Sequence, residues 1–210
     1  MTAWQSLYQL AQLSSDQRIL IIGGAGGCGT MAIQLAKLKG AYVAATCSSS
    51  NVGNLQLLGV DCVIDYTQQD FSSTSLLGGS DYDVVFDTVG EEGNFYKACR
   101  VLKTNGIYVT TVACQGREPL TLTGGASFLG SFLLHKFQEF MMGTVRYHLV
   151  AYSPSSENLA AMHAIVCSNQ VKPIVDSTFP LTDVAVAHLY SKRAHMFGKV
   201  VFCHSATSHH

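Results

Sequence analysis

Charged side chains are scarce in this sequence. Lysine, arginine, aspartate and glutamate make up only 13% of its 210 residues, and the formal net charge is -1. This balance leaves no basic field for a nucleic acid and no acidic tail, so we expect no nucleic acid partner. It also indicates that part of the surface is covered, either by a partner subunit or by polypeptide outside this chain.

Cysteine and histidine pairs with the spacing of metal ligands are missing as well. The seven cysteines stand singly without a C-x-x-C pair, the histidines share no regular spacing, and His209 and His210 resemble a tag remnant. We therefore expect no metal site. The cysteines are interpreted as small buried apolar side chains in a reducing compartment.

Long apolar runs are also absent. No run reaches the roughly 18 residues that a membrane-spanning helix requires, and the first residues lack the character of a signal or transit peptide. We expect a soluble intracellular protein without a membrane span, located in the cytoplasm or in mitochondria. The hydrophobic composition of 48% is sufficient for one α/β core.

Glycine, by contrast, is concentrated in the stretch that organises the chain, residues 19–37. Four aliphatic residues precede a glycine-rich turn and an apolar helical pattern, which predicts a buried strand, a tight turn and a helix. Gly24, Gly26 and Gly29 match G-x-G-x-x-G, whose glycines permit the turn, admit a pyrophosphate and pack helix on strand. Plain packing turns and methyltransferases also contain this pattern, so alone it leaves those alternatives open.

Strand and helix patterns alternate along the whole chain, which predicts an α/β fold. We expect a doubly wound six-stranded parallel sheet of the Rossmann type, with ligands bound beyond the C-terminal strand ends. Its strands are predicted over 18–22, 41–46, 62–65, 83–87, 106–112 and 144–151. Helices are predicted over 2–13 with Thr2 as N-cap, 28–39, 52–58, 71–77, 93–102, 125–142, 156–168 and 183–193. Two further strands, 171–180 and 198–202, need a sheet to join.

The polar run after the second strand bears on the choice of dinucleotide. An acidic residue about 20 residues beyond the glycines would bind the ribose 2′-hydroxyl of NAD, or the ribose of a methyltransferase cofactor, and none is present. Ser48 and Ser49 leave room for a 2′-phosphate and can donate hydrogen bonds to it, which favours NADP. However, no Lys or Arg lies between Gly40 and Tyr96, and a plain serine-rich turn is the alternative.

The order of these motifs resembles the medium-chain dehydrogenase/reductases, and within them the zinc-independent quinone oxidoreductase branch. The resemblance covers nearly the whole chain. Its markers are 2–7, 23–29 with 32–37, 59–66 and 87–90. The tail segments 171–173, 178–180 and 195–199 are similar to the reticulon-interacting mitochondrial oxidoreductases.

The resemblance implies NADPH as cofactor and hydride transfer to a quinone or an α,β-unsaturated carbonyl. It places one group of residues along the cofactor, and it supplies the missing cation from the C-terminal part of the chain. These residues are Gly26, Gly27 and Cys28 at the pyrophosphate, Ser48 and Ser49 at the 2′-phosphate, Tyr66 at the adenosine half, Val89, Gly90 and Val112 near the nicotinamide, and Lys199 with Arg193 as cations. The family often has a lysine where Asn51 stands here, which weakens the NADP assignment.

No residue is an evident catalytic acid. Asp87 and Tyr66 are candidates only because they are expected to border the crevice. Since a quinone can take its proton from solvent, no protein acid is required. The catalytic residues are therefore left unassigned.

Family members begin with a GroES-like domain, and this chain starts after it. We therefore expect residues 1–152 to form the NADP-binding Rossmann domain. Residues 153–210 are expected to supply a helix that continues this domain, followed by the C-terminal strands and helix of the truncated catalytic domain, with unpaired strand edges. The alternative to an active reductase is a catalytically silent nucleotide-binding or interaction fragment. We also expect a homodimer paired through the sixth strand, residues 144–151.

Overall fold

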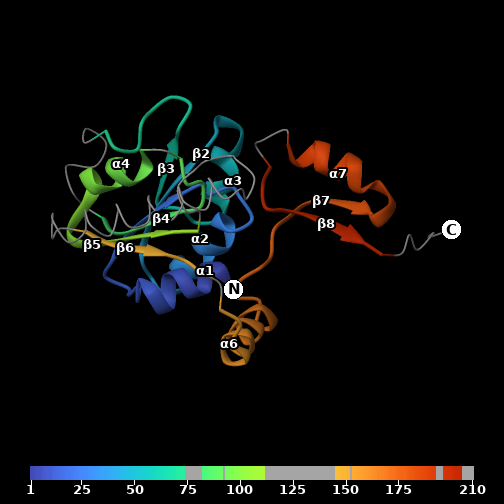
Figure 1. Ribbon diagram of the computed structural model, residues 1–210, viewed down its shortest axis with the longest axis horizontal. Coiled ribbons are helices and arrows are strands. Elements are labelled where there is room, and N and C mark those ends of the chain that lie inside the picture. Colours follow the sequence, from blue (N-terminus) through green and yellow to red (C-terminus); the bar gives the residue numbers. More distant parts are fainter. Residues whose placement is uncertain (74–81, 92, 112–144, 152, 193–195, 205–210) are drawn as a thin grey trace, which may run out of the picture.

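A six-stranded parallel sheet forms the centre of the protein (Figure 1). The computed structural model describes residues 1–73, 82–91, 93–111, 145–151, 153–192 and 196–204. The strand order is β3-β2-β1-β4-β5-β6, as the alternating pattern predicts for a Rossmann-type fold. The strands are β1 (Arg18–Ile22), β2 (Tyr42–Cys47), β3 (Cys62–Asp65), β4 (Tyr82–Asp87), β5 (Leu102–Thr110) and β6 (Val145–Leu149).

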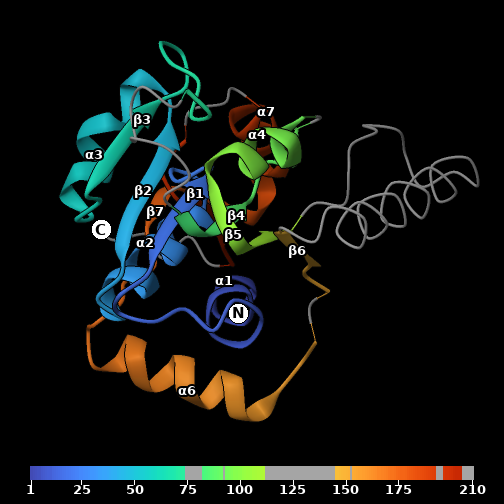
Figure 2. The ribbon, with the colours of Figure 1, turned by 90° about the vertical axis from the view of Figure 1, so that its left-hand side faces the viewer.

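Helices cover both faces of this sheet because successive strand residues point to opposite sides (Figures 1 and 2). Ile19 and Ile21 pack with the N-terminal helices, whereas Leu20 and Ile22 pack on the side of α4. The helices are α1 (Thr2–Trp4), η1 (Gln5–Leu10), α2 (Gly29–Leu38), η2 (Ser49–Asn51), α3 (Val52–Leu57), α4 (Asn94–Val101) and α6 (Ser156–Cys167).

The first helix differs from the prediction. A regular α-helix over 2–13 with Thr2 as cap is wrong, because α1 is capped at Met1 and passes into the π-helix η1. Within η1 the bonds reach five residues back, as from the Ala11 amide to the Ser6 carbonyl at 2.9 Å. The wider turn accompanies three successive buried residues, which 3.6-residue periodicity does not anticipate.

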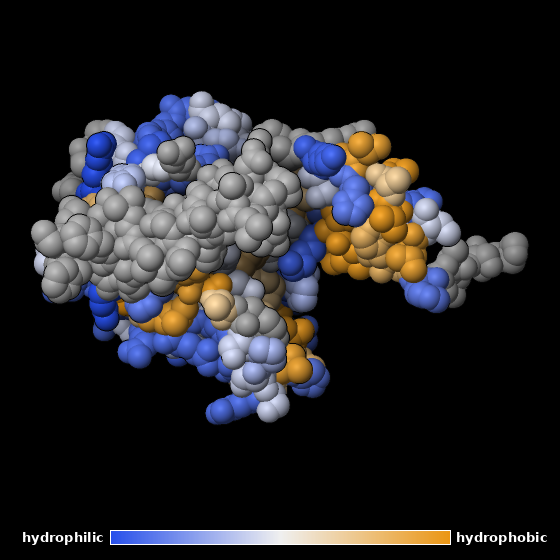
Figure 3. All heavy atoms as spheres, in the orientation of Figure 1, coloured by the Kyte–Doolittle hydropathy of each residue, from blue (hydrophilic) through white to orange (hydrophobic). Residues whose placement is uncertain are grey.

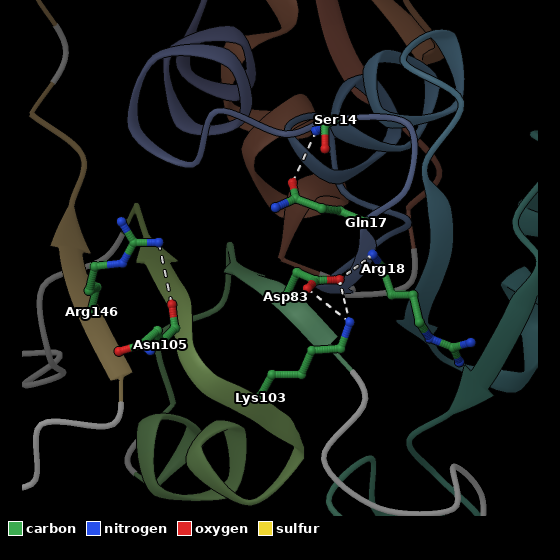
Figure 4. Close-up of polar contacts among 7 residues, drawn as sticks. All are labelled: Ser14, Gln17, Arg18, Asp83, Lys103, Asn105 and Arg146. Atoms are coloured by element: carbon green, nitrogen blue, oxygen red, sulfur yellow. Dashed lines mark hydrogen bonds and ion pairs between the residues drawn. The ribbon is translucent and has the colours of Figure 1, made fainter.

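Polar contacts hold the N-terminal ends of the strands together, opposite the glycine turn (Figure 4). Asp83 accepts hydrogen bonds from the Arg18 amide at 2.8 Å and from the Lys103 ammonium at 2.9 Å. Arg146 donates to the Asn105 carbonyl at 3.3 Å. These contacts link β1, β4, β5 and β6 at their starting residues.

The last two strands form a small sheet of their own beside the main sheet (Figure 1). β7 (Val175–Pro180) pairs in parallel with β8 (Lys199–Cys203), and η4 (Leu181–Asp183) and α7 (Val184–Ser191) connect them. The two strands lie outside the six-stranded sheet, as expected, and the sheet that they needed to join is formed by their own pairing. Helix α6 instead joins the main core, where its Met162 is buried.

Several boundaries and burial predictions are corrected. β5 begins at Leu102 rather than 106, because Leu102 pairs with Tyr82 before a register shift in β4. Of the six cysteines the structure describes, only Cys47 is buried, and Cys167 is exposed. The predicted helix 125–142 and most of the predicted helix 71–77 lie outside the described residues. Within the described part of the chain, no helix is both long and apolar enough to cross a membrane.

Candidate nucleotide-binding site

A pocket of about 690 Å³ lies at the C-terminal ends of β1, β2, β3 and β4. The sheet order reverses between β1 and β4, because β2 and β3 continue to one side and β5 and β6 to the other. Open α/β sheets bind their ligands at such a switch point. The pocket is therefore where the fold itself predicts a ligand.

The glycine turn forms the floor of this pocket. The left-handed backbone, φ +84°, lies at Gly23, one residue before the glycine that the motif assigns to the turn. A Cβ on Gly29 would collide with the Gly23 carbonyl and the Gly24 backbone, so Gly29 allows α2 to pack on the turn. A Cβ on Gly26 would have room, because its nearest neighbour would be the Gly23 carbonyl oxygen at 3.6 Å, an ordinary van der Waals contact. The backbone is thus open to a ligand at Gly26.

Helix α2 presents its N-terminus at the end of this turn. Cys28 is the N-cap, and no side chain caps the first turn of the helix. The first backbone amides of a helix and its dipole attract anions, so a phosphate fits this position. Burial raises the pKa of the Cys28 thiol above its ordinary value, although the Lys199 ammonium acts in the opposite direction.

The C-terminal sheet brings a cation to the turn. The Gly198 amide donates to the Ala25 carbonyl at 2.9 Å, which joins the start of β8 to the glycine turn. A Cβ on Gly27 would lie 2.9 Å from the Lys199 Nζ. Lys199 has no ion-pair partner among the described residues, so its charge is available to a phosphate at the turn.

The polar run after β2 makes a hydrogen bond to the Asp65 carboxylate, which was not predicted from the sequence as a site residue. Ser48 is buried and lines the pocket, whereas Ser49 donates its hydroxyl proton to Asp65 at the end of β3. Thr67 also donates to Asp65, through its amide at 2.9 Å and its hydroxyl at 2.7 Å. The parallel pairing of β2 and β3 was the available signal, because parallel strands end at one edge.

The loop after β4 is shaped by Asp87. Asp87 is fully buried, and its Oδ1 accepts hydrogen bonds from the amides of Val89 at 2.8 Å and Gly90 at 2.9 Å. Its Oδ2 accepts from Asn94 at 3.0 Å and Tyr108 at 2.7 Å. Asp87 therefore does not border the crevice as expected but positions the loop that does.

The far wall carries an ion pair that the sequence analysis also missed. Lys97 lies 2.7 Å from Asp70, and both line the pocket together with Phe71. Burial alone would raise the pKa of Asp70, but Lys97 and the Ser72 amide and hydroxyl lower it to about 2. In the sequence, Lys97 follows directly after the stretch from Gly40 to Tyr96, which contains no Lys or Arg. Tyr66, 54% exposed, lines the same pocket.

The structure thus brings most of the expected site residues to one place. Gly26, Gly27, Ser48, Tyr66 and Val89 line the pocket. Gly24, Cys28, Gly29, Ser49, Gly90 and Lys199 belong to the turns and strand ends around it. Val112 and Arg193 lie outside the described residues. Among the residues that the structure covers, no three His, Cys, Asp or Glu side chains gather closely enough to hold a metal ion.

Comparison with known proteins agrees with this geometry. The model of the zinc-binding dehydrogenase family matches residues 58–202. Mouse NAD(P)H oxidoreductase RTN4IP1, mitochondrial, is 30% identical over 212 aligned positions, which cover 96% of this chain and 52% of that protein. Tomato 2-methylene-furan-3-one reductase is 32% identical over 204 positions, covering 95% of this chain and 43% of that protein. The quinone oxidoreductase of Coxiella burnetii superposes with a TM-score of 0.74 at 30% identity, covering 96% and 56% of the two chains.

Together, the fold and the site define a dinucleotide-binding domain of the Rossmann type. The chain belongs to the zinc-binding dehydrogenase family, within the quinone oxidoreductase-like branch of the medium-chain dehydrogenase/reductases. The family expected from the sequence motifs is thereby confirmed. The chain spans about half the length of the mouse and other RTN4IP1 relatives that it matches.

Proposed function

We propose that this protein is an NAD(P)H-dependent oxidoreductase that reduces a quinone or an α,β-unsaturated carbonyl, with NADPH as the hydride donor. The single observation that carries the proposal is the glycine turn, where the open Gly26 backbone, the uncapped start of α2 and Lys199 converge. The relatives' names, NAD(P)H oxidoreductase, trans-enoyl reductase and quinone oxidoreductase, support the reaction class.

The bound dinucleotide would supply the hydride, and the chain would bind and orient it. The first amides of α2 and the Lys199 ammonium would hold the diphosphate. Ser48 and Ser49 would contact the adenosine ribose, and Tyr66 would lie beside the adenosine half. Val89 and Gly90, whose amides Asp87 holds, would border the nicotinamide end together with Val112. Arg193 would add a second cation near the cofactor.

No catalytic acid is assigned. Asp87 is buried with both oxygens engaged, and Tyr66 is a pocket wall residue whose hydroxyl makes no hydrogen bond within the described part of the chain. The proton that completes quinone reduction would come from solvent. We also propose that zinc takes no part, as the family resemblance implies, so dialysis against a chelator should leave NADPH oxidation unchanged.

Fluorescence titration with NADPH, followed by NADPH oxidation in the presence of a simple quinone, tests the proposal. Binding with oxidation would support it. Lys199→Ala should weaken binding about tenfold, because it removes a charge from the diphosphate site. Lys39→Ala is the matched control, because Lys39 lies at the opposite end of α2. A protein that binds no dinucleotide would contradict the proposal.

A catalytically silent nucleotide-binding or interaction module is the second candidate. The observation that favours it is the pocket itself, which is lined by the glycine turn and the strand ends expected to hold a nucleotide and in which no catalytic residue is assigned. Both candidates bind NADPH and differ in turnover, so binding without quinone-dependent oxidation identifies the silent module. For location we propose mitochondria, which the name of the RTN4IP1 relatives supports, or the cytoplasm. Immunofluorescence with an organelle marker distinguishes the two.

A further inference from the structure

Asp65 lies where the fold places the adenosine ribose. Cys47 at the end of β2 pairs in register with Asp65 at the end of β3, and the Tyr66 amide donates to the Cys47 carbonyl at 3.0 Å. Ser48 and Ser49 follow Cys47 directly. Since the ribose of a dinucleotide meets the end of the second strand, Asp65 shares its subsite with the two serines.

The Asp65 carboxylate accepts hydrogen bonds from the hydroxyl groups around it. Ser49 and Thr67 each donate a hydrogen bond to Asp65, and Gln68 adds a third at 2.9 Å. A hydroxyl has one proton, so Ser49 and Thr67 offer a ligand only oxygen lone pairs while they donate to Asp65. A ribose hydroxyl can donate to such oxygens, whereas a phosphate has nothing to donate when fully ionised.

The charge at this subsite is negative. Asp65 has no ion-pair partner among the described residues, and Lys97, which lines the far wall of the pocket, is engaged by Asp70. The hydrogen bond from Ser49 lowers the pKa of Asp65 against the effect of burial, and Thr67 and Gln68 lower it further. The carboxylate is therefore ionised at neutral pH and repels a 2′-phosphate.

We propose that Asp65 is a specificity-determining residue, which limits the preference for NADPH and lets the protein bind NADH as well. It acts through its own charge and by withholding the Ser49 hydroxyl from the 2′-phosphate. This inference rests on the proposed function, because it assumes that the pocket binds a nicotinamide dinucleotide. The wild-type dissociation constants for NADPH and NADH are expected to lie within about tenfold of each other.

Fluorescence titration of the full chain with NADPH and with NADH tests the inference. Asp65→Asn removes the charge and should tighten NADPH binding about tenfold, while NADH binding changes less than about twofold. Asp16→Asn is the matched control, since Asp16 is exposed in the turn before β1, at the opposite end of the sheet. It should change neither constant, which separates a local effect from one of net charge.

An unchanged ratio of the two constants in Asp65→Asn would overturn the inference, as would a wild-type preference for NADPH above about a hundredfold. Ser49→Ala provides a second measurement should Asp65→Asn not fold. It should weaken NADH binding more than NADPH binding, because the 2′-hydroxyl of NADH can donate to the Ser49 oxygen whereas a 2′-phosphate cannot. A larger loss for NADPH than for NADH would contradict the inference. Failure of the wild type to bind either dinucleotide would instead overturn the proposed function.

Discussion

Asp87 is a buried carboxylate that is satisfied without a cation. Its two oxygens accept four hydrogen bonds, two of them from the amides of Val89 and Gly90. We expect Asp87→Ala to lower the free energy of unfolding by about 3 kcal/mol, because several buried donors lose their acceptor. Urea denaturation followed by circular dichroism measures this. Tyr108→Phe, which removes one of the four bonds, should cost about 1 kcal/mol, and equal losses in both variants would contradict the account.

The Asp70 and Lys97 pair gives the fold a pH dependence in acid. The pKa of Asp70 is about 2 in the folded protein against an ordinary value of 3.8, so the ionised form stabilises the fold. That contribution is present above about pH 4 and is lost as the pH falls through about 2. Both side chains are 44% exposed, so we expect no more than about 1 kcal/mol.

Thermal unfolding of wild type and Asp70→Asn across this range measures the effect. At neutral pH the wild type should unfold at the higher temperature, and the difference should vanish near pH 2. Asp183→Asn is a control, since Asp183 lies in η4, away from this pocket. A difference that stays constant with pH would show that the ion pair is not its source.

Single residues could be predicted from the sequence only where a local motif placed them. Gly26 and Gly29 follow from the spacing of the glycine turn, and the C-terminal lysine, Lys199, followed from resemblance alone. The position of Asp65 could not be predicted from its neighbours in sequence, because strand pairing is what brings it beside Cys47 and Ser49. Lys97 was missed for the same reason, since only the fold brings α4 to the pocket.

Two glycines of the glycine turn have different expected roles, one in the stability of the fold and the other in ligand binding. A Cβ at Gly29 would meet the backbone of Gly23 and Gly24, whereas one at Gly26 has room. Gly29→Ala should therefore destabilise the protein by about 2 kcal/mol or more, as overpacking does. Gly26→Ala should leave unfolding unchanged but weaken NADPH binding about tenfold, because the added methyl group occupies the ligand's approach. Urea denaturation and fluorescence titration measure the two effects.

Losses of stability in both glycine variants would contradict these different roles of Gly26 and Gly29.

The secondary-structure elements themselves were largely predictable, because buried parallel strands are continuous apolar runs and the crossover helices have clear amphipathic spacing. The π-helix η1 was not, since its bonds depend on how Gln5 and Leu7 pack in the finished core. Pairing of β7 with β8 was not predictable either, because it needs the intervening η4 and α7 to return the chain.

At the scale of the molecule, β6 is the last strand in the sheet order and we predict that it pairs with a second copy. The Val150 amide donates a hydrogen bond to the Thr110 carbonyl of β5. Because successive amides of a strand point to opposite sides, the Leu149 amide points away from β5. Sedimentation equilibrium should show a dimer that dissociates on dilution. Leu149→Pro removes that outward donor and should give a monomer with an unchanged circular dichroism spectrum. A wild-type monomer at high concentration would contradict the prediction.

The small C-terminal sheet and α7 carry an apolar face, in keeping with the low content of charged residues in the chain (Figure 3). Val186, Leu189 and Phe202 are 55%, 64% and 40% exposed. Exposed apolar area of this kind binds hydrophobic dyes and promotes association. We expect the double variant Val186→Lys with Leu189→Lys to lower anilinonaphthalene sulfonate fluorescence and light scattering. Its affinity for NADPH should stay unchanged, because α7 does not line the pocket. The control is Leu57→Lys on α3, also exposed, and an equal effect there would show that added charge rather than this face is responsible.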